Sequence, residues 1–297
     1  FEILGIGSAP PPPPPQELIK VIATINENID LKPKCFIKKI IIPIKKIKMK
    51  KALITGASSG IGFEYAKYLD QNGWSLDLVS HSEERSKKAR DFFQNNNNNY
   101  YHLDLSKKDS ILELLDKIDC PDLVVANAGI TMMSKAGESS SLQRDELYYL
   151  LCGGVIDLIE GLVPRFKEKD ASRIVIISSI GAVTPMPKSS LYASAKSAIY
   201  SYGRSIGEEL ANENISVTIS LPGYVKTNAH KRAGLDHLEK KIPFWMWVSA
   251  EKVVKMTEKA SIAGKSTVIP GLAYKLVKPF LGMEITSKAW KMLNKRN

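Results

Sequence analysis

Tyr192 and Lys196 are the two residues of this 297-residue chain whose types and spacing best suit acid/base chemistry. They lie four residues apart in a segment with a helical pattern, so their side chains share one face of the helix. A free tyrosine has a pKa of about 10, too high for ready proton exchange at neutral pH, and a nearby ammonium lowers it by stabilising the phenolate. Such pairs are also common on ordinary helices, so the surrounding motifs decide the interpretation.

A glycine-rich turn, Thr55-Gly-Ala-Ser-Ser-Gly-Ile-Gly62, follows the first predicted strand and opens the first predicted helix. Glycine lets the backbone turn tightly and approach a pyrophosphate, and the helix N-terminus offers free N–H groups and a favourable dipole. A plain structural turn is the alternative interpretation, but the strand–turn–helix setting favours a nucleotide site. The spacing is G-x-x-x-G-x-G, whereas most dinucleotide-binding folds have G-x-G-x-x-G.

Strand and helix patterns alternate from Met49 onward. Nearly continuous apolar runs predict buried strands at 52–54, 76–79, 123–126, 174–177 and 217–221, with a short strand near 100–103. Helical patterns lie between them, near 61–72, 84–93, 108–117, 142–168 and 190–213. This alternation predicts an α/β fold, a doubly wound, Rossmann-type parallel sheet with helices on both faces.

Five motifs, in this order, resemble those of the classical branch of the short-chain dehydrogenase/reductase family. They are the Thr55–Gly62 turn, Asp104-Leu105, Asn127-Ala128-Gly129, Tyr192-x-x-x-Lys196 and Pro222-Gly223-x-Val225-x-Thr227. The resemblance covers residues 50 to about 230 and continues more loosely to the end. It implies an oxidoreductase that interconverts a carbonyl and an alcohol by hydride transfer, with Tyr192 as the acid/base.

The resemblance also implies a set of cofactor contacts. Asp104 would hydrogen-bond the adenine, Lys196 would hold the ribose and the Pro222–Thr227 segment would cup the nicotinamide. The implied cofactor-binding residues are Thr55, Gly56, Ser58, Ser59, Gly60, Ile61, Gly62, Ser80, His81, Asp104, Leu105, Asn127, Ala128, Gly129, Tyr192, Lys196, Pro222, Gly223, Val225 and Thr227.

A catalytic serine is implied at the end of the fifth predicted strand. In the family this serine usually lies thirteen residues before the tyrosine, which selects Ser179 rather than Ser178. The Ser179 hydroxyl would polarise the substrate carbonyl. Ser178 is interpreted as a strand-end serine that bonds local backbone.

One position departs from the family's pattern. The family often has a catalytic asparagine in the helix before the fifth strand, and alignment on Gly154 and Pro164 places Leu151 there, or Cys152 if the alignment shifts by one residue. Leucine cannot hold a proton-relay water. The relay therefore runs differently, or activity is reduced, or the chain is a nucleotide-binding sensor or scaffold. An epimerase of the extended branch shares Y-x-x-x-K, but the glycine spacing and the short C-terminal part argue against it.

The end of the second predicted strand bears on the choice of cofactor. An NAD-binding member usually carries an acid at the position of Ser80, where it binds the ribose 2′-OH. Ser80 is neutral, so a 2′-phosphate would meet no repulsion, and His81, Ser82 and Arg85 are available to contact it. The sequence therefore predicts NADP(H) rather than NAD(H), although His81 and Arg85 fit a role as surface residues equally well.

Composition narrows the class of partner and compartment. The net charge of +11 comes without a Lys/Arg block interleaved with aromatics, so we interpret it as a solvated surface and not as a nucleic-acid site. Three widely spaced cysteines predict no metal site and a cytoplasmic location. The sequence has no uncharged apolar run long enough to span a membrane, so we expect no transmembrane segment. The resemblance implies a small-molecule substrate and a homodimer or homotetramer.

The two ends of the chain and one aromatic cluster complete the predictions. Residues 1–48 include a proline run and precede Met49, so we expect them to lie outside a single Rossmann-type domain at 49–297; a docking arm is the alternative. The cluster at Pro243–Trp247 predicts an apolar substrate wall, or else a membrane- or dimer-facing patch. The basic tail from Tyr274 to Asn297 predicts a packed helix, with contact to anionic lipid as the alternative.

Overall fold

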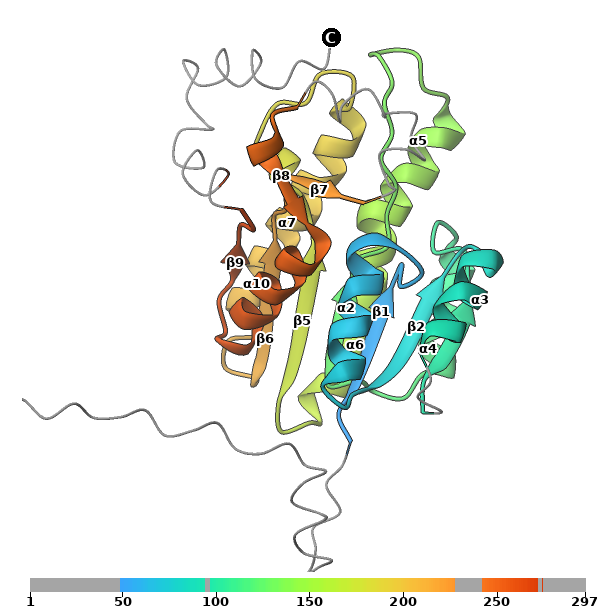
Figure 1. Ribbon diagram of the computed structural model, residues 1–297, viewed down its shortest axis with the longest axis vertical. Helices are drawn as coiled ribbons and strands as arrows, with labels where there is room; N and C mark the ends of the chain where they lie inside the picture. Colours follow the sequence, from blue (N-terminus) through green and yellow to red (C-terminus); the bar gives the residue numbers. More distant parts are fainter. Residues whose placement is uncertain (1–48, 94–96, 228–241, 272–273, 275–297) are drawn as a thin grey trace, which may run out of the picture. The chain divides into compact units, whose positions relative to one another are not determined.

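The computed structural model describes residues 49–93, 97–227, 242–271 and 274 (Figure 1). Within these ranges, seven parallel strands form one sheet in the order β3-β2-β1-β4-β5-β6-β9. The strands are β1 (Lys51–Thr55), β2 (Ser75–Ser80), β3 (Asn99–His102), β4 (Leu123–Ala126), β5 (Ser172–Ile177), β6 (Ile215–Ser220) and β9 (Thr267–Val268). The strand order reverses between β1 and β4, which is where ligands bind in doubly wound sheets.

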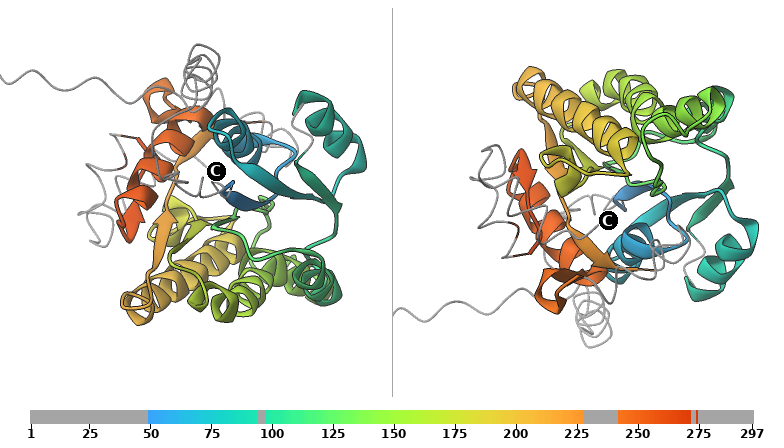
Figure 2. Two further views of the ribbon diagram at one scale, coloured as in Figure 1. Left: turned by 90° about the horizontal axis from the view of Figure 1, so that it is seen from below. Right: turned by 90° about the horizontal axis from the view of Figure 1, so that it is seen from above.

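Helices cover both faces of this sheet, as the two views of Figure 2 show. One face is covered by α2 (Gly60–Gln71), α3 (Glu83–Phe92) and α10 (Ala250–Ile262). The other is covered by α4 (Lys108–Lys117), α6 (Gly154–Lys167) and α7 (Ser190–Glu209). The predicted doubly wound α/β fold is therefore confirmed.

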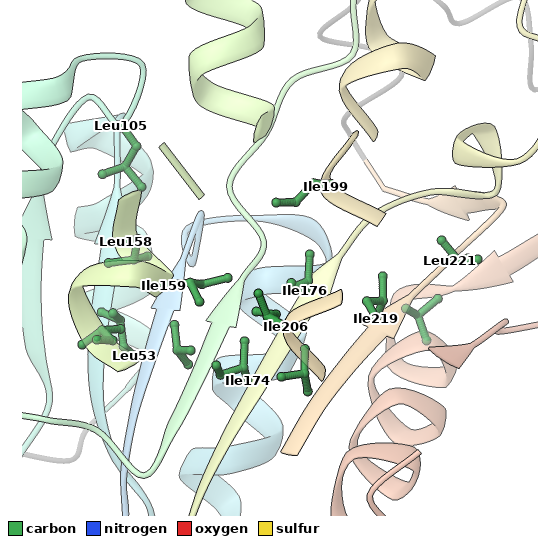
Figure 3. Close-up of a cluster of buried hydrophobic side chains, with 14 of the residues drawn as sticks. Leu53, Leu105, Leu158, Ile159, Ile174, Ile176, Ile199, Ile206, Ile219 and Leu221 are labelled. Atoms are coloured by element: carbon green, nitrogen blue, oxygen red, sulfur yellow. The ribbon is translucent and has the colours of Figure 1, made fainter. Parts of the chain in front are cut away.

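Two hydrophobic clusters hold the layers together. Successive residues of a strand point to opposite faces, so Leu53 of β1 belongs to the cluster under α6 and α7, whereas Ile54 belongs to the one under α2. The first cluster includes Leu158, Ile174 and Ile219 (Figure 3). Full burial of each such side chain stabilises the fold by roughly 1.5–3 kcal/mol.

The helix predicted over 142–168 is present in the structure and contains a π-helical turn that was not predicted. It consists of α5 (Ser141–Tyr148), a π-helical turn at Tyr149–Gly153 and α6. The Tyr149 ring lies against Gly153 and Gly154, where an added Cβ would come within 3.0 and 3.1 Å of it. The Tyr149 hydroxyl donates to Asp157 Oδ2 at 2.7 Å, so the ring is fixed at both ends.

By length and composition, the continuous helical stretch Ser141–Lys167 is long and apolar enough to cross a membrane. A core helix has the same composition, and α6 packs Leu158, Leu162 and Phe166 into the cluster beneath it. The predictions for residues 1–48 and for the tail after Tyr274 concern residues outside the described ranges.

Candidate active site

The structure gathers the predicted motifs at one edge of the sheet. Because all strands are parallel, their carboxyl ends meet there (Figure 1). The glycine turn follows β1, and the other motifs follow β2 to β6. Ser80 is the last residue of β2, and the segments that follow β3, β4, β5 and β6 carry Asp104, Asn127, Ser179 and Pro222.

The glycine turn needs its three glycines for two reasons, backbone conformation at Gly56 and Gly60 and close packing at Gly62. Gly56 and Gly60 have φ of 68° and 60°, in the left-handed region that favours glycine. A Cβ on Gly62 would lie 2.4 Å from both the Gly56 carbonyl oxygen and Asn127 Nδ2. The turn therefore brings the start of α2 close against the end of β4, and the first N–H groups of α2 lack helical partners. This cradle fits a pyrophosphate.

Thr55 and Asn127 lock the ends of β1 and β4 to each other. The Asn127 amide Nδ2 donates to the Thr55 and Gly56 carbonyls at 2.9 and 3.3 Å. The backbone N–H groups of Asn127 and Ala128 donate to Thr55 Oγ1 at 2.9 and 3.0 Å. These predicted cofactor residues therefore use their polar atoms to fix the shape of the turn.

The residues after β2 and β3 lie side by side. The Ser80 hydroxyl is buried and hydrogen-bonds to Ser86 Oγ. The His81 side chain is 71% exposed, with Nδ1 3.7 Å from Asp104 Oδ1. Burial favours the neutral form of Asp104, but two hydrogen bonds from Ser106 outweigh it and hold the pKa of the carboxyl below its usual value. The carboxylate is therefore an ionised hydrogen-bond acceptor. The side chain of Leu105, by contrast, packs into the core.

Tyr192 and Lys196 lie in the first two turns of α7, beside the end of β5. Tyr192 is half-buried and packs against a small cluster that includes Leu151 and Ala195. Lys196 is 6% exposed and its Nζ donates to the Ile177 carbonyl at 2.8 Å. Burial lowers the pKa of Lys196 from 10.5 to about 8, although Cys152 acts in the opposite direction.

The two serines after β5 have different partners. The Ser178 hydroxyl donates to the backbone carbonyl of Lys196 at 2.8 Å, in agreement with its interpretation as a structural residue. Ser179 precedes a short 3-10 turn, and its Oγ accepts the Gly181 N–H at 3.1 Å. That bond leaves the Ser179 O–H hydrogen to be donated elsewhere.

Leu151 lies beside the lysine. Its side chain is fully buried, and a Cβ added to Gly129 would lie 2.9 Å from Leu151 Cδ2 and 4.0 Å from Lys196 Nζ. Cys152 is half-buried. Burial raises the pKa of its thiol, and the charge of Lys196 offsets only part of this rise. An apolar side chain and the lysine therefore border the same space above Gly129.

The Pro222–Thr227 segment spans the site from β6 to the glycine turn. The Pro222 carbonyl accepts the Ile180 N–H at 2.9 Å, and the Thr227 methyl lies 3.4 Å from the Cβ position of Gly60. Within this segment, β7 (Tyr224–Lys226) pairs in parallel with β8 (Trp247–Ser249).

Tyr274 supports this segment and was not identified from the sequence. Its buried hydroxyl donates to the Met246 carbonyl at 2.7 Å and accepts the Tyr224 N–H at 3.0 Å. Its ring lies against Gly223, where a Cβ would come within 2.0 Å of Tyr274 Cζ. No motif marks this residue, because its partners are backbone groups from two other segments.

The aromatic cluster before β8 is split between core and surface. Phe244 and Trp245 are 86% and 50% exposed, whereas Met246 is buried in the core. Phe244 and Trp245 are therefore the residues of this cluster that are exposed enough to form the predicted apolar wall, and Met246 is not. Within the described ranges, no three His, Cys, Asp or Glu residues are grouped so that they could hold a metal ion.

Comparison with known proteins gives matches over most of the domain. A family model described as short chain dehydrogenase matches residues 50–237. An uncharacterized oxidoreductase of Staphylococcus epidermidis is 30% identical over 186 residues, which are 61% of this chain and 80% of that protein. The 3-oxoacyl-[acyl-carrier-protein] reductase of Buchnera aphidicola subsp. Schizaphis graminum is 29% identical over 243 residues, 77% of this chain and 99% of that protein.

Solved structures share the fold. A short-chain dehydrogenase from Sphingobium yanoikuyae in complex with NADPH aligns with a TM-score of 0.70 and 22% identity, over 84% of this chain and 97% of that one. A putative NAD(P)-dependent gluconate 5-dehydrogenase from Beutenbergia cavernae with bound NADP aligns with a TM-score of 0.67 and 21% identity, over 76% of this chain and 97% of that one.

Proposed function

Because the chain belongs to the short-chain dehydrogenase family, we propose that it is an NADP(H)-dependent oxidoreductase that interconverts a carbonyl and an alcohol. The observation that carries the proposal is the placement of Ser179, Tyr192 and Lys196 beside β5, at the edge where the glycine turn forms its cradle. A bound nicotinamide supplies or accepts the hydride.

The chain's own residues handle the proton and the oxygen. Ser179 donates its O–H to the substrate oxygen and polarises the carbonyl. Tyr192 gives its phenolic proton to that oxygen in reduction and takes it back in oxidation. Lys196 stabilises the phenolate by its charge and binds the cofactor ribose.

Two features support NADP(H) over NAD(H). Ser80 carries no charge and turns its hydroxyl toward Ser86. Arg85 Nε is buried and has no hydrogen-bond partner among the described residues, so the guanidinium has bonding capacity left for an anion. Because the position of Ser80 carries no acid, a 2′-phosphate meets no carboxylate at that position.

We also propose a small, partly apolar substrate, a cytoplasmic location and a homodimer or homotetramer. The exposed Phe244 and Trp245 support an apolar contact for the substrate. Leu142 and Tyr148 of α5 are 66% and 37% exposed, and they support self-association through this helix and its neighbours.

A nucleotide-binding sensor or scaffold is a second candidate, and Leu151 is the observation that favours it. The experiment that separates the two is a panel of ketones and aldehydes with NADPH and with NADH, followed by the nicotinamide absorbance. The proposed enzyme oxidises NADPH with at least one carbonyl, and faster than NADH. Tight NADPH binding without turnover on any carbonyl or alcohol would support the sensor.

A further inference from the structure

Lys196 lies between the end of β5 and the π-helical turn, with almost no exposure to solvent. Its ammonium donates to the Ile177 carbonyl at 2.8 Å. In the described part of the chain, Cys152 on the π-helical turn is the titratable group that acts on its charge, and Tyr192 lies one turn earlier on the same helix. The neighbouring ends of β4 and β5 carry no ionisable side chain.

Leu151 belongs to the π-helical turn that lies near Lys196. A Cβ added to Gly129 would lie 2.9 Å from Leu151 Cδ2 and 4.0 Å from Lys196 Nζ, so both side chains border the same space. Leu151 packs in one cluster with Leu147 and Ala195, and Cys152 lies at the border of that cluster. A leucine offers water no hydrogen bond, and a water needs two to four polar partners to stay buried. The part of this surface that Leu151 supplies is therefore apolar.

The π-helical turn fixes Leu151 in this place. The Tyr149 ring occupies the space beside Gly153 and Gly154, and the Tyr149 hydroxyl is bonded to Asp157. Single π-turns inside helices are frequent at functional sites. The side chain at position 151 is therefore held next to the space above Gly129 that Lys196 Nζ also borders.

We propose that Leu151 is a positioning residue: its side chain keeps water from Lys196 and thereby sets the pH above which the active site loses the ammonium. This inference rests on the proposed function. Removal of the ammonium leaves the Tyr192 phenolate without its stabilising charge, so catalysis falls at alkaline pH.

The electrostatics agree with this geometry. Burial lowers the pKa of Lys196 to about 8, against an ordinary value of 10.5, and Cys152 acts in the opposite direction. A polar side chain at position 151 would hydrate the ammonium and move its loss to higher pH.

The test compares wild type with Leu151→Asn and with Leu151→Met, an apolar change of similar volume. The measured quantity is kcat/KM for NADPH from pH 6 to 10, because kcat/KM reports the ionisations of the free enzyme. In wild type and Leu151→Met we expect the alkaline fall near pH 8; in Leu151→Asn it moves up by about one pH unit or more. An unchanged profile in Leu151→Asn, or an equal shift in Leu151→Met, overturns the proposal.

A second measurement does not depend on turnover. Lysine labelled with ¹³C at Cε gives an NMR signal for Lys196, which is assigned by its loss in Lys196→Met. We expect its titration midpoint near pH 8 in wild type and higher in Leu151→Asn; a midpoint near 10.5 in wild type contradicts the proposal. If Leu151→Asn does not fold, Leu151→Ala leaves room for water and should shift the midpoint in the same direction. If the protein shows no turnover but Lys196 titrates with the expected midpoints, the proposed enzymatic function is wrong and the proposed role of Leu151 still holds.

Discussion

At the scale of single residues, the surroundings decide what a side chain can do. Ser178 and Ser179 are neighbours in the sequence, but Ser178 donates to a backbone carbonyl and Ser179 accepts a backbone N–H. The family's spacing selects Ser179 as the catalytic serine, and that role stays a prediction. The surroundings of Lys196 could not be predicted, because Leu151, Gly129 and Ile177 reach it from three different segments.

The buried ammonium of Lys196 should cost the folded protein stability at neutral pH. Its folded pKa of about 8 lies below the ordinary 10.5, so the unfolded chain binds the proton more strongly and stability rises with pH between these values. We expect Lys196→Met to raise the free energy of unfolding at pH 7 by up to about 3 kcal/mol. Chemical denaturation at pH 7 and 10.5 measures this.

The gain should shrink as the pH rises from 8 to 10.5 and beyond, because the folded lysine is then neutral and the unfolded lysine progressively loses its proton. Lys135→Met is the matched control, since this lysine side chain is 69% exposed and its removal should change stability by less than about 0.5 kcal/mol. An unfolding free energy that falls in Lys196→Met at pH 7 would show that the ammonium stabilises the fold.

The proposed preference for NADP(H) can be tested at one residue, Ser80. Ser80→Asp places a carboxylate against a 2′-phosphate, so we expect NADPH to bind more tightly than NADH in wild type and less tightly in the variant. Fluorescence titration with both cofactors measures the two affinities. Ser80→Ala removes the hydroxyl without adding charge and should keep the wild-type order. Preference of the wild type for NADH contradicts the assignment.

At the scale of elements, the strands were predictable and the breaks between helical segments were not. Strands β1, β2, β4, β5 and β6 fall within two residues of their predicted bounds, because each carries several apolar residues that are buried in a parallel sheet. The helix predicted to residue 213 ends at Glu209, before a turn that Asn214 closes at φ of 54°. The π-helical turn depends on contacts of Tyr149 that apolar periodicity does not record.

The glycine turn gives a prediction about an element. Gly62→Ala would place a methyl group 2.4 Å from the Gly56 carbonyl oxygen, so the turn must open and the cradle must change shape. We expect NADPH affinity to fall by at least about tenfold, an effect of roughly 1.4 kcal/mol. Calorimetric titration measures the affinity.

Gly207→Ala on α7 is the matched control for this change. Its Cβ would meet Val217 at 3.5 Å, an ordinary contact, and alanine is favoured over glycine in a helix by about 1 kcal/mol. Stability should rise in this variant and affinity should stay the same. Equal affinities in Gly62→Ala and wild type would mean that the turn does not bind the cofactor.

At the scale of the whole molecule, charge is distributed unevenly along the chain. In the described residues, 24 Lys and Arg balance 24 Asp and Glu. The excess of +11 therefore belongs entirely to the rest of the sequence, mainly to residues 1–48 and 275–297. Residues 1–48 alone contribute eight lysines against four acids. A basic surface of the folded domain is thus not needed to explain the net charge.

The predicted domain boundary can be tested by truncation. A chain that begins at Met49 should fold with unchanged stability and NADPH affinity, because β1 begins at Lys51 and the site lies wholly after it. Thermal unfolding with and without NADPH measures both properties. Loss of soluble protein on this truncation would show that residues 1–48 contribute to the fold.

Tyr192→Phe tests the proposed chemistry most directly, because it removes one hydroxyl and keeps the ring in its cluster. Tyr200→Phe, on the same helix, is the matched control and should turn over like wild type. We expect turnover in Tyr192→Phe to fall by at least about 10²-fold, the usual effect of losing a general acid, while NADPH affinity stays within about twofold. Full turnover in Tyr192→Phe with the cofactor bound would contradict the role of Tyr192 as the proton donor.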